Sequence, residues 1–405
     1  MGTMQNVSDP VVVCGAARTP IGAFQGELAS LPAMALGSVA IKAAIERANL
    51  KGEAVDEAFM GCVLPAGLGQ APARQAVFGA GLPRSVGATT VNKMCGSGMK
   101  AAMLGCDALL VGSADVVVAG GMESMSNAPY LLAKARGGYR MGHERILDHM
   151  MLDGLEDAYE IAPDGKRRAM GTFGEDCAAK YGFTRAQQDE FAIRSVTRAQ
   201  QAAKSGAFDW EMTPVVVTQK AGLSTVSSDE GPRRSAIEKI PGLRPAFASN
   251  GTITAASSSS ISDGAAALVL MRQSMAEKQG APILARIAGY ASHAQDPAWF
   301  TTAPITAIRK LQDKIGWTTT EVDLYEVNEA FAVVAMAATA ELGIPAEKLN
   351  IHGGACALGH PIGATGARII VTLLGALRAT GGRRGIASLC IGGGEATAIA
   401  LETPK

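Results

Sequence analysis

Cys95 is the first residue whose type and position could support covalent chemistry, and it lies in the stretch VNKMCGSGMKAAMLGC. It comes directly before an apolar pattern that predicts a helix over Gly96–Leu110. The start of a helix presents unpaired N–H groups and a partial positive charge, and both lower the pKa of a thiol. Gly96 and Gly98 leave room for a bulky substrate group beside the backbone. The stretch predicts a nucleophilic cysteine, with a buried and inert cysteine as the alternative.

His360 is the best candidate for a base that would activate such a thiol. It lies in NIHGGACALGHPIGATGARII, in a glycine-rich turn before a helix expected over Ala364–Ala379. Pro361 restricts His360 to an extended backbone, so the turn can aim its imidazole into a cleft. Histidine is a natural general base for a thiol near neutral pH. His352 is an alternative base, but no proline follows it.

A second cysteine and an asparagine also stand at the ends of expected strands. Cys390 lies in SLCIGGGEATAIALE and is followed by Gly392 and two further glycines, so it is either placed to touch a substrate or is a core cysteine before a turn. Asn328, in YEVNEAFAVVAMA, either caps the helix that follows or holds a catalytic water. Two cysteines, one histidine and one asparagine at element ends indicate a thiol-based active site.

Two further motifs are weaker. Ser257 to Ser260 form a small polar loop before an apolar strand, and this loop is either a substrate contact or a plain turn. The stretch from Gly96 to Ala101 matches the dinucleotide fingerprint G-x-G-x-x-A, but no convincing apolar strand runs into it. The acidic residue that should close the next strand is also missing, because Asp115 opens its strand. An NAD-dependent dehydrogenase is therefore not expected.

Short β-branched segments alternate with amphipathic helical segments along most of the chain, a pattern typical of α/β proteins. Strands are expected at Val11–Cys14, Ala58–Val63, Val116–Ala119, Ala265–Met271, Ile283–Tyr290, Leu324–Val327 and Ile386–Ile391. Helices are expected at Ala35–Asn49, Gly96–Leu110, Ala186–Lys204, Ile305–Ile315, Ala330–Leu342 and Ala364–Ala379.

The two ends of the chain echo each other. Ala40-Ile41-Lys42 precedes Val55-Asp56 by the same separation at which Ala307-Ile308-Arg309 precedes Val322-Asp323. This repeated order suggests two similar α/β domains, although any α/β protein repeats its elements to some extent. The segment from Ala128 to Asn250 breaks the pattern and is richer in charge and glycine. It is interpreted as an inserted excursion with its own helix, with a mobile surface loop as the alternative.

Composition narrows the class of protein further. Lys+Arg and Asp+Glu balance at 37 each, which argues against a nucleic-acid or membrane partner recognised by bulk charge. The seven cysteines form no CxxC pair and show no metal-ligand spacing, so reduced thiols in the cytoplasm are expected. No segment approaches about 18 uninterrupted apolar residues, and no signal peptide is recognised.

Taken in order, these motifs resemble the thiolase family over nearly the whole chain, from AARTPIGAF to GGGEATAIALE. The resemblance implies two similar α/β halves in a layered α-β-α-β-α arrangement. The N-terminal half would comprise residues 4–127 and 251–276, and the C-terminal half residues 277–405. An inserted loop domain over residues 128–250 would cover the coenzyme A site and the acyl pocket.

The resemblance also implies a role for each candidate. Cys95 would attack an acyl-CoA thioester and become acylated, and His360 would take its proton. Cys390 would deprotonate the α-carbon of the second acetyl-CoA. His360 with a water held by Asn328 would form one oxyanion hole, and the backbone N–H groups of Cys95 and Gly392 the other.

Substrate contacts follow from the same resemblance. Ser259 matches a pantetheine contact, Arg233 a basic residue near the adenine–phosphate end, Met170 a residue of the acyl pocket and Phe300 a position in the pocket wall. Four positions depart from patterns common in the family and leave the acyl-chain preference open. They are Ala169, Ser257, Phe300 and Cys356.

The implied reaction is the reversible condensation of two acetyl-CoA to acetoacetyl-CoA, or the thiolytic cleavage of short-chain 3-ketoacyl-CoA. Coenzyme A thioesters would be the substrates, with no permanently bound cofactor and no metal, and the chain would form a homotetramer. One alternative is a 3-ketoacyl synthase of the same fold, which condenses without a second reactive cysteine, so Cys390 favours a thiolase. The other is a non-catalytic acyl-CoA-binding protein, against which the retention of all four candidate groups speaks.

Overall fold

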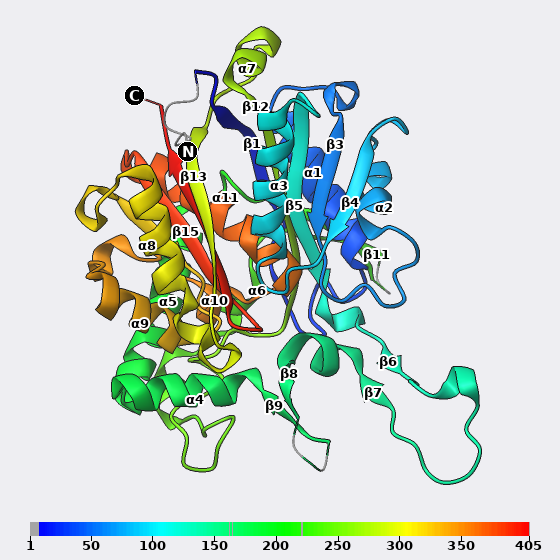
Figure 1. The fold of residues 1–405 in the computed structure, drawn as a ribbon, viewed down its shortest axis with the longest axis vertical. Helices are drawn as coiled ribbons and strands as arrows, with labels where there is room; N and C mark the ends of the chain where they lie inside the picture. The colour runs from blue at the N-terminus through cyan, green and yellow to red at the C-terminus, as the bar shows by residue number, and fades with distance from the viewer. Residues whose placement is uncertain (1–7, 162, 164, 220–221, 405) are drawn as a thin grey trace.

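The main strands of the protein join into one mixed sheet that consists of two equivalent halves (Figure 1). The computed structural model describes residues 8–161, 163, 165–219 and 222–404. Residues 4–7 and Lys405, which belong to the predicted halves, lie outside the described residues.

The first half contains five strands in the order β4, β3, β5, β12 and β1. In it β3 is parallel to β4 and β5, while β12 is antiparallel to β5 and β1. Their bounds are β4 Gly87–Val91, β3 Glu57–Gly61, β5 Val116–Ser124, β12 Ser262–Arg272 and β1 Val11–Arg18.

The second half repeats this arrangement with β14, β15, β16 and β13 in order. Here β14 is parallel to β15, and β16 is antiparallel to β15 and β13. Tyr325 of β14 also makes a parallel bridge with Leu349, at the place that β4 takes in the first half. The halves meet where β1 pairs antiparallel with β13. The bounds are β14 Leu324–Val327, β15 Arg384–Ile391, β16 Glu395–Glu402 and β13 Ala285–Ala294.

The residue echo at the two ends of the chain reflects this repeated topology. Each echoed aspartate follows a helix and precedes a strand, α1 (Ala33–Arg47) before β3 and α8 (Ala303–Ile315) before β14. Asp56 Oδ2 accepts hydrogen bonds from the N–H groups of Asp115 and Val116, at 2.8 and 2.9 Å. Asp323 Oδ2 accepts in the same way from Arg383 and Arg384, at 2.7 and 2.9 Å. The equivalent carboxylates therefore fix the starts of β5 and β15.

Helices separate and cover the two halves, giving five layers. Helix α1, with α2 (Pro72–Gly79), covers the outer face of the first half, and α8, with α9 (Ala332–Leu342), covers the outer face of the second. Helices α3 (Ser97–Val111) and α11 (Ile362–Thr380) pack on each other between the halves. The predicted α/β fold class and its layered arrangement are confirmed.

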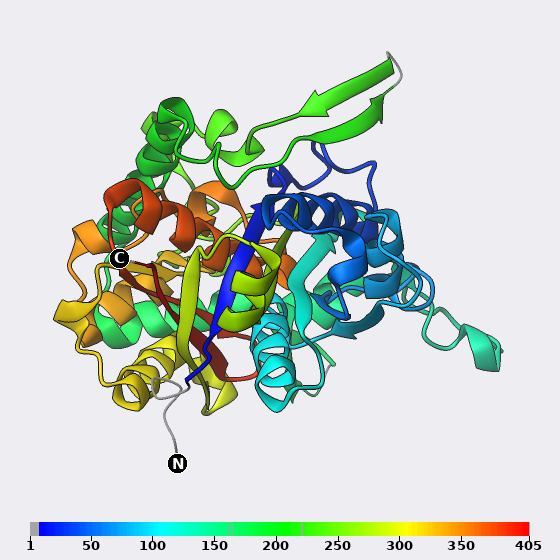
Figure 2. The same ribbon diagram turned by 90° about the horizontal axis from the view of Figure 1, so that it is seen from above.

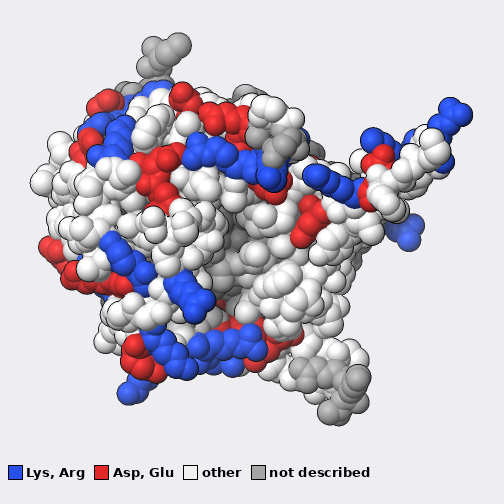
Figure 3. Space-filling model, turned by 90° about the horizontal axis from the view of Figure 1, so that it is seen from below, with Lys and Arg blue, Asp and Glu red and all other residues white. Residues whose placement is uncertain are grey.

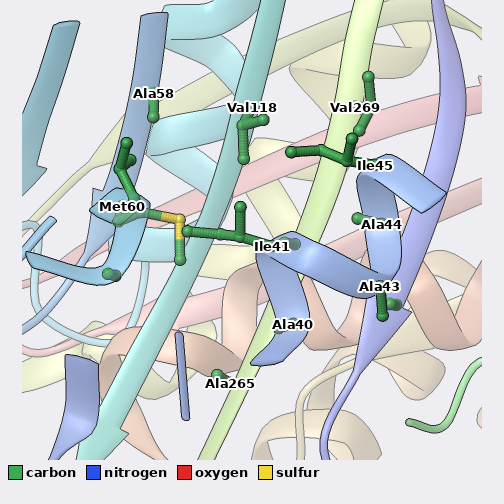
Figure 4. Close-up of a cluster of buried hydrophobic side chains, with 14 of the residues drawn as sticks. Ala40, Ile41, Ala43, Ala44, Ile45, Ala58, Met60, Val118, Ala265 and Val269 are labelled. Atoms are coloured by element: carbon green, nitrogen blue, oxygen red, sulfur yellow. The ribbon is translucent and has the colours of Figure 1, made fainter. Parts of the chain in front are cut away.

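Burial of small apolar side chains holds the layers together. In the outer layer of the first half, Ile41 of α1 points toward Met60 of β3 and Val118 of β5 (Figure 4). All three side chains are fully buried. Burying one such side chain stabilises a fold by about 1.5–3 kcal/mol. Two helical stretches, Met94–Val111 and Ile362–Thr380, are long and apolar enough by length and composition to cross a membrane, but 56% and 89% of their residues are buried within the fold.

The chain leaves this frame between β5 and β12. The excursion contains two long helices rather than the one predicted, α4 (Met170–Tyr181) and α5 (Arg185–Ser205), and two hairpins that project from the body (Figures 1 and 2). Its other elements are β6 Tyr130–Leu131, β7 Leu147–Asp148, β8 Glu156–Ile161, β9 Arg167–Ala169, β10 Val215–Gln219, β11 Gly222–Val226 and α6 Glu230–Arg234. Among the short elements outside the excursion are β2 Gly22–Ala23, which pairs with β12, α7 Gln273–Gln279 and α10 Ala355–Leu358. The exact domain boundaries stay a prediction.

Candidate active site

Cys95 lies in a tight turn just before α3 and is half-buried. Met94 beside it adopts a positive φ of 47°, an uncommon conformation for a residue with a side chain. The Ser97 hydroxyl holds the turn, because it donates to the Met94 carbonyl at 2.6 Å and accepts from the Lys93 N–H at 2.8 Å. Such strained turns are often found at functional sites, where surrounding contacts enforce them.

The glycines beside Cys95 serve packing, which differs from the sequence expectation that they admit a substrate group. A Cβ at Gly96 would come within 2.4 Å of Ile391 Cδ1, at the end of β15. A Cβ at Gly98 would come within 2.7 Å of the Ala367 nitrogen in α11. Glycine is therefore required so that the Cys95 turn can approach both elements of the second half.

The second sulfur lies beside the first. Cys390, the penultimate residue of β15, is fully buried, and burial raises the pKa of its thiol well above the usual value. The nearby Cys95 thiol raises the pKa of Cys390 further. The Gly392 N–H, in the turn after β15, points at the Cys95 sulfur. Lys93, two residues before Cys95, forms an ion pair with Glu395 at the start of β16. The structure thus brings Cys95, Cys390 and Gly392 together.

His360 lies between α10 and α11 and is almost fully buried. Its Nδ1 lies 2.7 Å from the Thr365 hydroxyl, and that hydroxyl donates its one proton to the Pro361 carbonyl at 3.0 Å. With the hydroxyl proton on the Pro361 carbonyl, Nδ1 donates to the Thr365 oxygen, which leaves the lone pair on Nε2. Nε2 is buried and has no hydrogen-bond partner among the described residues. This tautomer is the one that can accept a proton from a substrate or a thiol.

The start of α11 brings His360 into the same region as Cys95. Ile362, two residues after His360, packs in one apolar cluster with Cys95 and Met94. The Gly363 carbonyl lies 3.1 Å from the position of a Cβ on Gly98, so the first turns of α3 and α11 are in contact. Cys95 and His360 each precede the helix that follows them by two residues.

Asn328 comes directly after β14 and is buried, with its N–H donating to the Ser388 carbonyl at 2.9 Å. Its Oδ1 accepts from Arg368 Nη2 at 3.4 Å. Its Nδ2 is buried and finds no acceptor in the part of the chain that the structure describes. Strand β14 pairs parallel with β15, with Val327 opposite Ser388, and Cys390 lies two residues beyond Ser388. Asn328 therefore lies at the same end of the sheet as Cys390. His360 Nε2 and Asn328 Nδ2 are thus two buried polar atoms available to a substrate or a water.

Protonation in the resting site differs from the sequence expectation of a lowered thiol pKa. Burial raises the pKa of Cys95 to about 11, although the N–H groups of Gly392 and of Cys95 itself point at the sulfur and lower it. Burial, helped by the positive charge of Arg368, lowers the pKa of His360 to about 3. At neutral pH the pair is therefore a neutral thiol and a neutral imidazole. The helix N-terminus is present, but desolvation outweighs it.

We expect the alkylation of Cys95 by iodoacetamide to rise about tenfold per pH unit between pH 6 and 9, because only the thiolate reacts. Peptide-resolved mass spectrometry would follow Cys95 separately from the other six cysteines. A preformed thiolate–imidazolium pair would instead give a rate that is already constant across this range, and such a plateau would contradict the neutral pair.

The predicted acyl-pocket residues come from two parts of the chain, Met170 from the excursion and Phe300 from the second half. Met170 begins α4, and its sulfur lies 3.6 Å from the position of a Cβ on Gly392. Phe300 is buried, contacts Phe173 edge to face at 5.9 Å, and belongs to the apolar cluster that contains Cys390. Met170 thus lies next to the reacting region, and Phe300 lies in the packed layer behind it.

The two predicted coenzyme A contacts, Ser259 and Arg233, lie in different surroundings. Ser259 is half-buried in the loop before β12, where its N–H donates to the Ala330 carbonyl at 2.9 Å. Arg233 pairs with Glu27 at 2.5 Å and is not among the residues that line the adjacent cavity of about 390 Å³. Arg234 and Lys239 line that cavity, as does Ser260. Figure 3 shows the face below α4, which has a hollow at its centre with lysine and arginine side chains around it.

Glu123 is a residue of this region that sequence reasoning missed. Its fully buried carboxylate accepts hydrogen bonds from the N–H groups of Val63, Leu64 and Gly363, at 2.9, 3.1 and 2.8 Å. Burial raises the pKa of Glu123 to about 7, against these three donors. Glu123 thereby ties the first turn of α11 to the first half. An acidic residue inside the apolar run VVVAGGMES was the signal available.

The fold and these converging groups define a thiolase, and the chain belongs to the thiolase family. The N-terminal domain of this family matches residues 11–274, and the C-terminal domain matches residues 281–403. The family membership predicted from the motifs is confirmed.

Proteins similar to this chain over nearly its whole length are found in a plant, a fungus and a bacterium. Acetyl-CoA acetyltransferase 2 of Arabidopsis thaliana is 51% identical over 395 residues, which are 97% of this chain and 96% of that protein. The acetyl-CoA acetyltransferase of Schizosaccharomyces pombe is 48% identical over 98% of this chain and 99% of its own length. That of Cupriavidus necator is 47% identical over 97% and 99%.

Proposed function

We propose that the protein is an acetyl-CoA C-acetyltransferase, which joins two acetyl-CoA into acetoacetyl-CoA and coenzyme A and runs the same reaction in reverse. The observation that carries the proposal is that two thiols lie side by side, Cys95 in the turn before α3 and Cys390 at the end of β15. The names of the relatives support the same reaction. The paired cysteines also favour a thiolase over a synthase that uses a single reactive cysteine. The substrates are coenzyme A thioesters, and no resident cofactor takes part.

In the first half-reaction, His360 Nε2 takes the proton of the Cys95 thiol as the sulfur attacks the thioester carbonyl. The N–H groups of Cys95 and Gly392 stabilise the oxyanion of the tetrahedral intermediate. Collapse of the intermediate leaves acetyl-Cys95 and expels coenzyme A as a thiolate. Cys390 gives its proton to this thiolate, so the step ends with a Cys390 thiolate and a protonated His360.

In the second half-reaction, the Cys390 thiolate removes a proton from the α-carbon of the second acetyl-CoA. The enolate oxygen is stabilised by the Nε2–H that His360 has gained and by a water bound to Asn328 Nδ2. The α-carbon attacks acetyl-Cys95, and acetoacetyl-CoA leaves. Cys95 recovers its proton from His360, and all three groups return to their starting states.

A panel of 3-ketoacyl-CoA substrates of increasing length tests the substrate range. We expect kcat/KM for cleavage to be highest with acetoacetyl-CoA and to fall at least about tenfold once the chain is several carbons longer, because a filled acyl pocket rejects added methylene groups. Met170 and Phe300 are proposed as the pocket residues that impose this limit. Equal or rising kcat/KM with long chains would contradict the short-chain assignment, and failure to cleave any member would contradict the function.

The proposed assembly is a homotetramer in the cytoplasm. The arm formed by residues 130–148 projects from the body (Figure 1). It carries five exposed large apolar side chains, those of Tyr130, Leu132, Tyr139, Met141 and Ile146. Exposed apolar side chains grouped in this way usually contact another chain. Light scattering is expected to give a mass of about four chains, and a monomer at micromolar concentration would contradict the assembly. The seven free cysteines support a reducing compartment.

For coenzyme A, Ser259 is proposed to contact the pantetheine arm. Arg233 remains the proposed contact of the adenine–phosphate end, although Glu27 already pairs with it. Its neighbour Arg234 lines the cavity instead, so the basic contribution to that end is expected to come from both arginines.

A further inference from the structure

Arg368 is a buried cation of α11 that lies behind the active site. It is 2% exposed. Its Nη2 donates to Asn328 Oδ1 at 3.4 Å, and its Nη1 lies 3.8 Å from Glu326 Oε2. Nε and Nη1 have no hydrogen-bond partner within the described ranges. Taking a guanidinium out of water is costly, and the Glu326 carboxylate at 3.8 Å offsets part of this cost.

The hydrogen bond from Arg368 sets the orientation of the Asn328 side-chain amide. Alternate residues of a strand face the same side, so Glu326 and Asn328, at the end of β14, both face α11. An amide that accepts a hydrogen bond through Oδ1 must present its NH₂ group the other way. Because Arg368 can only donate, it fixes which end of the Asn328 amide faces it. The other end is Nδ2, the buried donor that finds no acceptor among the residues that the structure describes.

Thr365 and Arg368 stand three residues apart and therefore share one face of α11. Thr365 holds Nδ1 of His360 and leaves Nε2 available, while Arg368 holds Oδ1 of Asn328 and leaves Nδ2 available. One face of one helix thus sets the two groups that, in the proposed function, share an oxyanion.

We propose that Arg368 is a positioning residue, which orients the Asn328 amide so that Nδ2 donates to the water of the enolate oxyanion hole. Arg368 itself does not touch the substrate. The inference rests on the proposed function, since it assigns Asn328 to that oxyanion.

A double-mutant cycle tests this role. We expect Arg368→Met to lower kcat for condensation about 10- to 100-fold, as a misplaced oxyanion donor does, with KM changed by less than about threefold. Arg368→Lys keeps a donor and the charge and should recover most of this loss. In an Asn328→Ala background, Arg368→Met should add no further loss, because the two residues act as one unit. Arg378→Met, an exposed arginine on the same helix, is the matched control and should be unaffected.

Asn328→Asp provides an independent arm that keeps the buried cation paired. The carboxylate would still accept from Arg368 but has no N–H to donate, so this variant should be as slow as Asn328→Ala. Wild-type-like condensation by Asn328→Asp, full activity of Arg368→Met, or multiplicative losses in the double variant would each overturn the proposal. Wild-type protein without acetoacetyl-CoA cleavage would instead reject the proposed function itself.

Discussion

Replacing Cys95 by Ala is expected to lower coenzyme A-dependent cleavage of acetoacetyl-CoA on the order of 10⁴-fold or more, because removal of a covalent nucleophile removes the acyl-enzyme pathway. The loss should appear in kcat, while binding of the substrate should change little. The change removes one sulfur from a half-buried turn, so the thermal unfolding midpoint should shift only slightly.

Cys106→Ala is the matched control for this experiment. Cys106 is a fully buried free cysteine of α3, the helix that follows Cys95, and takes no part in the proposed reaction. Its variant should keep near wild-type turnover even if packing is weakened. Normal turnover by Cys95→Ala, or an equal loss in both variants, would reject the assignment of Cys95 as nucleophile.

Replacing Cys390 by Ala should separate the two half-reactions. Acetyl-CoA is still expected to acetylate Cys95, since His360 and the N–H groups of Cys95 and Gly392 remain. Condensation should fall about 10²–10⁴-fold, the range expected for loss of a general base. Intact-mass spectrometry after mixing with acetyl-CoA should show one added acetyl group per chain, and peptide mapping should place it on Cys95.

Two results would count against this division of roles. One is the absence of any acetyl adduct on the Cys390→Ala variant, even after long incubation. The other is condensation at the wild-type rate, which would show that another group removes the α-proton. A stable adduct without product formation is the expected outcome.

Much of the fold follows from local sequence pattern. Strand β14 spans the predicted residues Leu324–Val327, and the six predicted helices are all present with small changes at their ends. Three strands of the main sheet were not predicted: the two-residue strand β2 and the longer strands β4 and β16. Strand β4 is a mixed, half-exposed edge segment, GATTV, without an apolar run. Strand β16, EATAIALE, is rich in alanine, which has little preference for strands, and becomes one only because β13 and β15 flank it.

The site was predictable where a residue type and a glycine-rich turn coincide along the chain. Cys95, His360 and Cys390 each carry that local signature, and Asn328 stands directly after a predicted strand. Glu123, Thr365 and Arg368 do not, because their partners come from distant parts of the chain and only the packed layers bring them together.

The protonation state of Cys95 was predicted with the wrong sign for the same reason. The helix N-terminus is visible in the sequence, but the loss of water around the sulfur is a property of the assembled halves. Burial then raises the pKa of the thiol to about 11. A thiol with this pKa needs a neighbouring base to deprotonate it, and His360 is that base in the proposed reaction.

A crystal structure of the Cys390→Ala variant soaked with acetyl-CoA is the most direct test of the account. We predict an acetyl group on Cys95 Sγ, its carbonyl oxygen facing the N–H groups of Cys95 and Gly392, and His360 Nε2 within hydrogen-bonding reach of the site. An acetyl group on any other residue, or a His360 that faces away from acetyl-Cys95, would contradict it.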